Sequence, residues 1–303
     1  MRLLLVDGHY YAYRSFFAIR NLSNSRGEPT NAVFGFVKAL RKMIADVRPD
    51  AAAVVWDAGL PERRMQLLPS YKQQREETPP DLSVQFPVIE RAVAALGFHN
   101  VRLEGHEADD LIASYAAAAR RKGGGDVVIA TNDKDIYALV GEGIAVYSTN
   151  KTDTGGAKDG VLLGPAEVEA KWGVPPGLIP DVLALTGDAV DNIPGVGGVG
   201  TKTAAKLVRE HGRVALLAEN PAVIRNEKLR AKVAAAAGRL RDNLELVRLE
   251  EDLPLPVVLE ALSLRPDPAA MLALARECEF RSLTAEFEKL AGAADKPVQG
   301  EFF

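Results

Sequence analysis

The chain has 303 residues, of which 47% are hydrophobic and 26% are charged, and its formal net charge is −4. This size allows one large domain or two ordinary ones with a sizeable apolar core. A single cysteine, Cys278, excludes a disulfide framework, and the N-terminal apolar run "LLLV" is too short for a signal peptide or a membrane span. We therefore expect a soluble cytoplasmic protein without a membrane partner, and the net charge at first argues against a polyanionic one.

The first half of the chain alternates short apolar strands with helical patterns. Continuously apolar strands separated by helices indicate a parallel sheet covered on both faces. The sequence thus predicts an α/β domain over residues 1–165, with flanking helices such as 32–47 and 108–123. The expected strands are residues 3–7, 51–57, 127–133 and 144–148.

A proline-rich, charged segment, residues 59–87, interrupts this alternation after the second strand. It is either an exposed loop or an insertion positioned over the mouth of a site. Long insertions in compact domains are often functional, so we favour the second interpretation.

Beyond residue 165 the patterns are all helical. We place a domain boundary there, just after a polar loop at 149–160, and predict a second, helical domain over residues 166–290. Residues 291–303 are small and polar apart from the last two, which is typical of a flexible tail. The expected helices of the second domain are 165–173, 178–187, 201–212 and 227–249.

The stretch "IPGVGGVGTKT", residues 193–203, carries Gly195, Gly197 and Gly200 at the spacing G-x-G-x-x-G. A dinucleotide site would need a strand before these glycines, but the preceding residues have helical spacing. A phosphate-binding P-loop would need adjacent Gly and Lys, and Thr201 separates them. The simplest interpretation is a glycine-rich turn between two helices.

Acidic residues follow three of the expected strands and open one helix. Each has a structural explanation alone, because acids cap helix N-termini and begin turns. The whole set is harder to explain, since two carboxylates about 4 Å apart repel by roughly 4 kcal/mol at an effective dielectric constant near 20. The set comprises Asp7, Asp57, Glu107, Asp109, Asp110, Asp133, Asp135, Asp188 and Asp191.

Such a cluster requires protons or cations among its carboxylates. Oxygen ligands without His or Cys select Mg²⁺ or Mn²⁺ over zinc, and magnesium sites of this kind usually act on phosphates. The chain has 41 acidic residues, so 32 remain outside the set of nine, against 37 Lys and Arg. The rest of the molecule is therefore net basic, which fits an anionic substrate.

Several stretches together carry a family resemblance, in order from residue 1 to about 290. They include "LLLVDGHYYAYRSFFA", "SYKQQR", "EADDLIAS", "IATNDKD" and "LTGDAVDNIPGVGGVGTKTAAKL". In this combination the chain resembles the 5′→3′ exonuclease (flap endonuclease) domain of bacterial DNA polymerase I. The linker and polymerase sequence do not follow, so the resemblance is to a stand-alone family member or to an excised domain.

The resemblance implies a two-metal phosphodiesterase that uses Mg²⁺, with Mn²⁺ as an alternative ion. Two ions about 3.5–4 Å apart would activate a water and stabilise the leaving 3′-oxygen, so no side chain need act as nucleophile. The first ion would be held by Asp7, Asp57, Glu107 and Asp109, and the second by Asp110, Asp133, Asp135, Asp188 and Asp191.

The resemblance also assigns the glycine-rich stretch to the turn of a helix-three-turn-helix that binds duplex DNA. Glycine lets backbone N–H groups approach phosphates closely, and the N-terminus of the following helix adds positive potential. Lys202, Lys206 and Arg209 would form a basic face of that helix. In relatives this turn also takes a monovalent cation, K⁺. The implied DNA-binding residues are Gly195, Gly197, Gly200, Thr201, Lys202, Lys206 and Arg209.

The insertion at 59–87 matches the helical arch of the family, through or under which free 5′ single strands pass. Lys72 and Arg75, with Tyr71 beside them, would meet the scissile phosphate and its neighbouring base. Arg14 would help to steer the same strand. Without the "SYKxxR" match, solvated surface charge would be the simpler explanation of Lys72 and Arg75.

We therefore expect a monomeric, Mg²⁺-dependent 5′ nuclease associated with the nucleoid, acting on DNA with 5′ flaps or 5′ ends in primer removal and repair. One alternative is an RNA-cleaving nuclease with a similar sheet, and the DNA-binding helices argue against it. Another is a DNA-binding relative without activity, and the complete acid set argues against that.

The C-terminal "QGEFF" resembles the short peptide by which bacterial replication enzymes bind the sliding clamp. Phe302 and Phe303 would fill an apolar pocket, and Gln299 would fix the register through hydrogen bonds. The alternative is that the two aromatic side chains fold back onto the parent domain.

Overall fold

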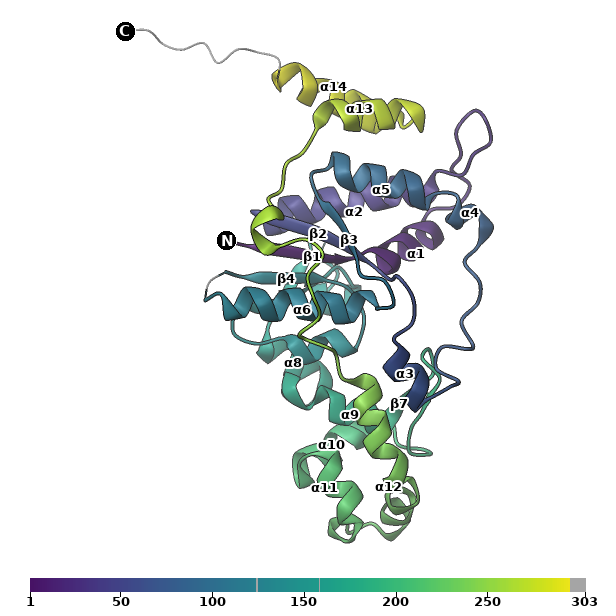
Figure 1. Ribbon diagram of the computed structural model, residues 1–303, viewed down its shortest axis with the longest axis vertical. Coiled ribbons are helices and arrows are strands. Elements are labelled where there is room, and N and C mark those ends of the chain that lie inside the picture. Colours follow the sequence, from purple (N-terminus) through teal and green to yellow (C-terminus); the bar gives the residue numbers. More distant parts are fainter. Residues whose placement is uncertain (124, 158, 295–303) are drawn as a thin grey trace.

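The computed structural model describes residues 1–123, 125–157 and 159–294 (Figure 1). A central sheet with helices on both faces occupies the middle of the molecule, and a group of helices lies below it in the view of Figure 1. The predicted α/β fold with a following helical region is confirmed. No helix in the described ranges combines the length and apolar character needed to cross a membrane.

The central sheet has six strands in the order β3-β2-β1-β4-β5-β6. The first five are parallel, and β6 is antiparallel to β5. The sequence analysis missed β3 and β6, because β3 has only one fully buried residue and β6 is three residues long. The strands are β1 (Leu3–Asp7), β2 (Ala51–Trp56), β3 (His99–Arg102), β4 (Val127–Ala130), β5 (Ile144–Ser148) and β6 (Val161–Leu163).

Alternate residues of the strands face two apolar cores. Leu4 and Val6 pack against α1, α2 and α5 on one face, whereas Leu3 and Leu5 pack against α6 on the other. This arrangement explains why the strands read as continuous apolar runs. The helices of this part are α1 (Gly8–Ala18), α2 (Asn31–Val47), α3 (Glu62–Leu67), α4 (Pro80–Ser83), α5 (Phe86–Ala95), α6 (Ala108–Arg121), α7 (Lys151–Thr154) and α8 (Pro165–Trp172).

The helical region packs α9 against α10, α11 and α12. Between α9 and α10 the chain forms a short antiparallel ladder and then the glycine-rich turn. Its elements are α9 (Ile179–Thr186), β7 (Gly187–Asp188), β8 (Ile193–Pro194), α10 (Thr201–His211), α11 (Val214–Glu219) and α12 (Glu227–Val247). Four 3-10 helices connect elements of both regions: η1 (Asp135–Leu139), η2 (Pro176–Leu178), η3 (Pro221–Val223) and η4 (Leu259–Ala261).

After α12 the chain returns to the sheet. The N–H of Leu264 donates to the carbonyl of Asp50 at 3.0 Å, and α13 (Pro268–Glu277) then packs on α5. The predicted helical domain included α13 and α14 (Arg281–Ala294). These two helices instead share a core with β1, α2 and α5 of the sheet region. Their apolar residues could cover either region, and the sequence does not reveal this return. The predicted boundary near residue 165 stays a prediction, and residues 295–303 lie outside the described part.

Candidate active site

Asp7 and Asp57 lie where β1 and β2 end, at the carboxyl edge of the sheet. One oxygen of Asp7 accepts the N–H of Tyr10 at 2.9 Å, and the other accepts the hydroxyl of Thr131 at 2.9 Å. Asp57 accepts the N–H of Ala108 at 2.8 Å, which links the end of β2 to the start of α6. Because parallel strands end at one edge, the fold brings these distant acids together.

The N-terminus of α6 supplies the tightest acidic group. Carboxylate oxygens of Glu107, Asp109 and Asp110 lie within 4.8 Å of one another. Glu107 is 3% exposed and Asp110 is fully buried. A cluster whose donors are all carboxylate oxygens fits hard divalent cations such as Mg²⁺.

The remaining acids come from the segment after β4, from the end of β7 and from the loop that follows β7. The N–H of Asp135 donates to Asp133 Oδ1 at 3.0 Å, and Lys134 forms an ion pair with Asp188. The pKa of Asp135 is raised well above its usual value, first by burial and then by the charges of Asp133, Asp191 and Asp188. The charges of Asp133, Asp188 and Asp191 therefore all act on the carboxyl of Asp135.

Burial also raises the pKa values of other carboxyls at this edge. The pKa of Asp7 is raised to about 7, by burial first and then by the charge of Asp57. The pKa of Asp109 lies well above its usual value, by burial and then by the charge of Asp110. Such carboxyls favour a bound proton or cation, so the cluster as a whole fits metal ions.

Arg64, in α3, lies among these acids with 2% exposure. Its guanidinium donates to both oxygens of Asp110 at 2.8 Å and also donates a hydrogen bond to the carboxylate of Glu107. The same group donates to the carbonyls of Leu246 at 3.0 Å and Arg248 at 3.1 Å. Through these hydrogen bonds Arg64 connects the start of the 59–87 insertion to α6 and to the end of α12.

The sequence analysis missed Arg64. Burial disfavours its charge, but the carboxylates of Asp109 and Asp110 outweigh this effect and raise its pKa. Its partners lie 43 to 184 positions away in the chain. No local pattern therefore marks the residue; the one available signal was an arginine beside Met65, which packs toward the core.

Tyr71 and Lys72 point into the acidic cluster. The ammonium of Lys72 bonds Glu107 and lies 3.6 Å from Asp191, and the hydroxyl of Tyr71 donates to Glu107 at 3.0 Å. Arg75 lies at the edge of the cluster, 3.5 Å from Asp191 and 46% exposed. Solvated surface charge therefore does not describe Lys72, which is 9% exposed.

Arg14 lies outside this network. It donates to the hydroxyl of Tyr10 at 3.3 Å and covers the rings of Tyr10 and Tyr11. Within the described ranges no carboxylate lies within 4.0 Å of it, so the structure does not bring Arg14 into contact with the acids. Its steering role stays a prediction.

The glycines of the turn differ in how much room their surroundings leave for a side chain. A Cβ on Gly195 would lie 2.1 Å from the carbonyl oxygen of Thr186, so only glycine fits there. Gly197 leaves open space, with no neighbouring atom within 4 Å of such a Cβ. Gly200 is the N-cap of α10, so the N–H groups that begin with Thr201 open onto the same surface.

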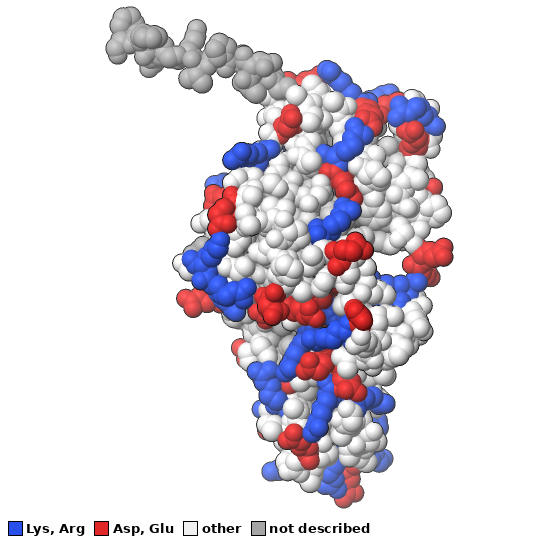
Figure 2. Space-filling view, viewed as in Figure 1, with Lys and Arg blue, Asp and Glu red and all other residues white. Residues whose placement is uncertain are grey.

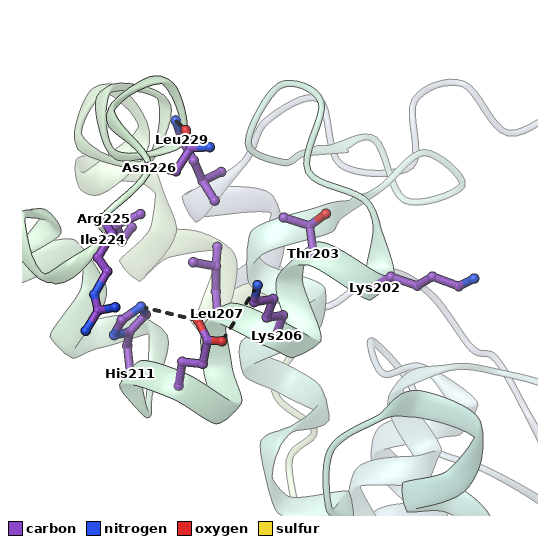
Figure 3. Close-up of a pocket in the computed structure, with 10 residues that line it drawn as sticks. Lys202, Thr203, Lys206, Leu207, His211, Ile224, Arg225, Asn226 and Leu229 are labelled. Atoms are coloured by element: carbon purple, nitrogen blue, oxygen red, sulfur yellow. Dashed lines mark hydrogen bonds and ion pairs between the residues drawn. The ribbon is translucent and has the colours of Figure 1, made fainter.

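A cavity of about 820 Å³ lies between α10 and the start of α12 (Figure 3). Lys202 and Lys206 line it from α10, and Arg225 lines it from the opposite side. Arg209 does not line it, because its guanidinium donates to the carbonyl of Gly173 at 3.1 Å. The predicted basic face of α10 thus divides, with two lysines on the cavity and the arginine toward α8.

The fold and the acidic edge define a nuclease family. Residues 2–173 match the family model "5'-3' exonuclease, N-terminal resolvase-like domain". Residues 174–269 match "5'-3' exonuclease, C-terminal SAM fold". The chain therefore belongs to the 5′-3′ exonuclease family, and the resemblance inferred from the motifs is confirmed.

Two curated relatives illustrate how the family uses this unit. A 5′-3′ exonuclease of Aquifex aeolicus is 38% identical over 289 residues, which is 95% of this chain and 96% of the relative. The thermostable DNA polymerase I of Thermus filiformis is 41% identical over 297 residues, covering 98% of this chain and 34% of the relative. The chain thus spans about a third of the length of the polymerase relatives that it matches.

Solved structures confirm the fold. The T5 5′-exonuclease with bound zinc ions has a TM-score of 0.67 at 21% identity, over 96% of this chain and 100% of that chain. Human GEN1 in complex with Holliday junction DNA has a TM-score of 0.60 at 16% identity, over 91% of this chain and 67% of that chain.

Proposed function

We propose that the chain is a Mg²⁺-dependent 5′ nuclease that hydrolyses phosphodiester bonds of DNA at 5′ flaps and 5′ ends, in primer removal and repair. The observation that carries this proposal is the all-carboxylate cluster at the sheet edge, with Tyr71 and Lys72 of the insertion pointing into it. A Holliday junction is bound by one structural relative, so other branched DNA substrates enter as controls.

The acids fit a pair of magnesium ions, because their oxygens are the ligands that this ion prefers and because burial disfavours their bare charges. When bound, two ions supply an activated water and stabilise the leaving oxygen. We propose that the acids divide as the resemblance implies, with Asp7, Asp57, Glu107 and Asp109 at one ion. Asp110, Asp133, Asp135, Asp188 and Asp191 are proposed for the other.

The residues of the insertion have separate proposed roles. Lys72 leaves Glu107 and donates to the scissile phosphate, where its charge stabilises negative charge that grows in the transition state. Arg75, at the exposed edge of the cluster, holds the adjacent phosphate, and Tyr71 contacts the neighbouring base. Arg14 steers the same strand from α1.

Duplex DNA is proposed to lie on the glycine-rich turn, where Gly195, Gly197, Gly200 and the N-terminus of α10 present backbone N–H groups to its phosphates. Lys202 and Lys206 add charge at the cavity beside them. Arg209 supports the helix from the side of α8. We also propose K⁺ at this turn, a monomeric protein and a location at the nucleoid in the cytoplasm. Binding of the sliding clamp by Gln299, Phe302 and Phe303 concerns residues outside the described part and stays a proposal.

The test is cleavage of a DNA duplex that carries a labelled 5′ single-stranded flap, with Mg²⁺ in large excess over the protein. We expect cleavage near the junction with Mg²⁺ and none with EDTA. The same assay includes an RNA flap, a blunt duplex and a four-way junction. Preferential cleavage of RNA would favour the alternative nuclease, and DNA binding without cleavage would contradict the proposed enzyme.

A further inference from the structure

Helix α12 presents a stripe of donors to the glycine-rich turn. Asn243 donates to the carbonyl of Pro194 at 2.8 Å, and Arg239 donates to the carbonyl of Gly195 at 3.1 Å. Lys232 completes the stripe, because its ammonium lies 2.9 Å from the position that a Cβ on Gly198 would take. Positions 232, 239 and 243 lie seven and four residues apart, which places them on one face of a helix.

This contact fixes which groups of the turn face outward. The carbonyls of Pro194 and Gly195 are occupied by α12. In the described ranges, the N–H groups of Gly197, Gly198 and Gly200 donate to no acceptor of the protein. A set of free N–H groups next to a positive charge is suited to an anion such as a phosphodiester.

Lys232 and Arg239 differ in their ion pairing from the two other arginines of the same helix. Arg230 lies 3.8 Å from Glu227, and Arg241 lies 3.3 Å from Glu219. Within residues 1–123, 125–157 and 159–294, no carboxylate lies within 4.0 Å of either Lys232 or Arg239. Both side chains are exposed, so their charge is available to a partner in solution.

We propose that α12 forms the second half of the DNA-binding site at this turn. Lys232 binds a backbone phosphate at Gly198, and Arg239 is a positioning residue that holds the turn through the carbonyl of Gly195. This inference rests on the proposed function, since it takes DNA as the anion, but it assigns residues of a different helix from α10. These residues are expected to contact phosphates and not bases, so the affinity for DNA should not depend on base sequence.

The first test measures affinity for a 5′-flap duplex by fluorescence anisotropy between 50 and 200 mM KCl, in EDTA so that no cleavage occurs. Loss of one phosphate contact lowers the slope of log K against log salt by about 0.9. For Lys232→Ala we therefore expect the fall in affinity across this salt range to be about 3.5-fold smaller than for the unmodified protein. Arg241→Ala, on the same helix, is the matched control and should leave the slope unchanged.

The second test concerns Arg239 and uses the kinetics of flap cleavage in Mg²⁺. Because Arg239 acts on the turn and not on the reacting phosphate, Arg239→Ala should raise KM by roughly tenfold and leave kcat unchanged. Arg239→Lys should restore part of the loss, since a lysine keeps a donor near Gly195. An equal fall in kcat, or no difference between the Ala and Lys variants, would overturn the positioning role.

Lys202→Ala distinguishes failure of the role proposed for α12 from failure of the proposed DNA binding by α10. If Lys202→Ala lowers the salt slope and Lys232→Ala does not, the role of α12 is wrong and DNA binding by α10 stands. If neither variant changes the slope, the turn does not bind DNA and both proposals fail. If Lys232→Ala and Arg241→Ala lower the salt slope equally, the change reflects the loss of any positive charge on α12. That result would also overturn the inference.

Discussion

The acidic edge of the sheet and the turn at α10 use their charged residues in opposite ways. At the edge, Arg64 and Lys72 are buried against carboxylates, and acids outnumber the cations around them. At the turn, Lys202 and Lys232 are exposed, and no carboxylate in the described ranges lies within 4.0 Å of them. Figure 2 shows Lys and Arg side chains running down the lower, helical part of the molecule, with acids between them.

This difference separates two tasks. A buried acidic excess needs protons or cations from solution, whereas exposed and unpaired cations are available to bind an anionic partner. A net charge of −4 conceals this division, because it adds the two regions together. Variants in the first region should therefore change the chemical step and the stability, and variants in the second should change affinity and its dependence on salt.

The largest expected effect is the loss of cleavage in Asp135→Asn. Removing one metal ligand should cost several kcal/mol of transition-state stabilisation, which is about 1,000-fold or more in rate. Affinity for the flap duplex should stay equal or increase, because repulsion of the phosphates falls. Single-turnover cleavage and anisotropy measure the two quantities. Near-normal turnover in Mg²⁺ would contradict the role of this acid.

Asp110→Ala is a less clean test of the same idea. Asp110 accepts two hydrogen bonds from Arg64, so its removal also leaves a buried cation without its main partner. A loss of cleavage in that variant combines chemistry and stability. Asp135→Asn avoids this ambiguity.

Arg64→Ala should produce the next largest effect, on stability. Breaking a buried ion pair by removing one partner costs about 3–5 kcal/mol. Thermal unfolding in EDTA should shift downward by roughly 10 °C, at about 2–4 °C per kcal/mol. The adjacent Arg63→Ala is the control, since Arg63 is 43% exposed and lies 3.7 Å from Glu245. Similar shifts in both variants would show that the buried contacts of Arg64 are not special.

Lys72→Ala tests whether the insertion acts at the chemical step. We expect cleavage at saturating DNA to fall about 100- to 1,000-fold, as for loss of one donor to a developing negative charge, with a small change in affinity. Rate and affinity are compared on the same flap substrate. A loss of affinity as large as the loss of rate would assign Lys72 to binding and remove the distinction between the two regions.

The acidic edge should also make the metal-free protein sensitive to pH. The pKa of Asp7 is raised to about 7 in the folded protein, and those of Asp109 and Asp135 are raised too. The folded state then binds more protons than the unfolded state between pH 4 and 7, so stability falls as pH rises through this range. Melting curves in EDTA at pH 5 and pH 8 measure the effect, and Mg²⁺ should reduce it at pH 8. A higher melting temperature at pH 8 in EDTA would contradict the raised pKa values.

The smallest effect is expected for Lys206→Ala. It should lower the salt slope by about 0.9 and leave kcat unchanged. Lys206 lies 3.8 Å from Glu210, an exposed pair of little energetic weight. Glu210→Ala therefore serves as the opposite variant and should tighten binding. A fall in kcat for Lys206→Ala would show that α10 contributes to the chemical step as well as to DNA binding.

The sequence predicted what depends on local pattern. The strand-end position of Asp7 and the opening of α6 at Glu107 follow from apolar runs and acids that a reader can see. Contacts that join distant segments could not be predicted in this way. Arg64 reaches the carbonyl of Leu246 across 182 positions, and α13 returns to the sheet after the whole helical region. Both depend on packing that no single stretch encodes.

The residue roles taken from the motifs stay predictions. Tyr71 and Lys72 both contact the carboxylate of Glu107. Arg14 donates to the hydroxyl of Tyr10 and Arg209 donates to the carbonyl of Gly173, and their roles toward DNA stay predictions. Short-range patterns indicate where acids at strand ends and helix starts lie, but not which partner a long cationic side chain contacts.

The backbone of Lys72 adopts a left-handed conformation, with φ of 56°. For a residue with a side chain, this costs about 1–2 kcal/mol relative to an ordinary conformation. The N–H of Lys72 holds the carbonyl of Asp191 at 3.1 Å, and its ammonium holds Glu107, so these contacts maintain the strained backbone. If a phosphate takes the ammonium from Glu107, as proposed above, one of the two contacts that offset this strain is lost, and the backbone of the insertion becomes freer to change its conformation.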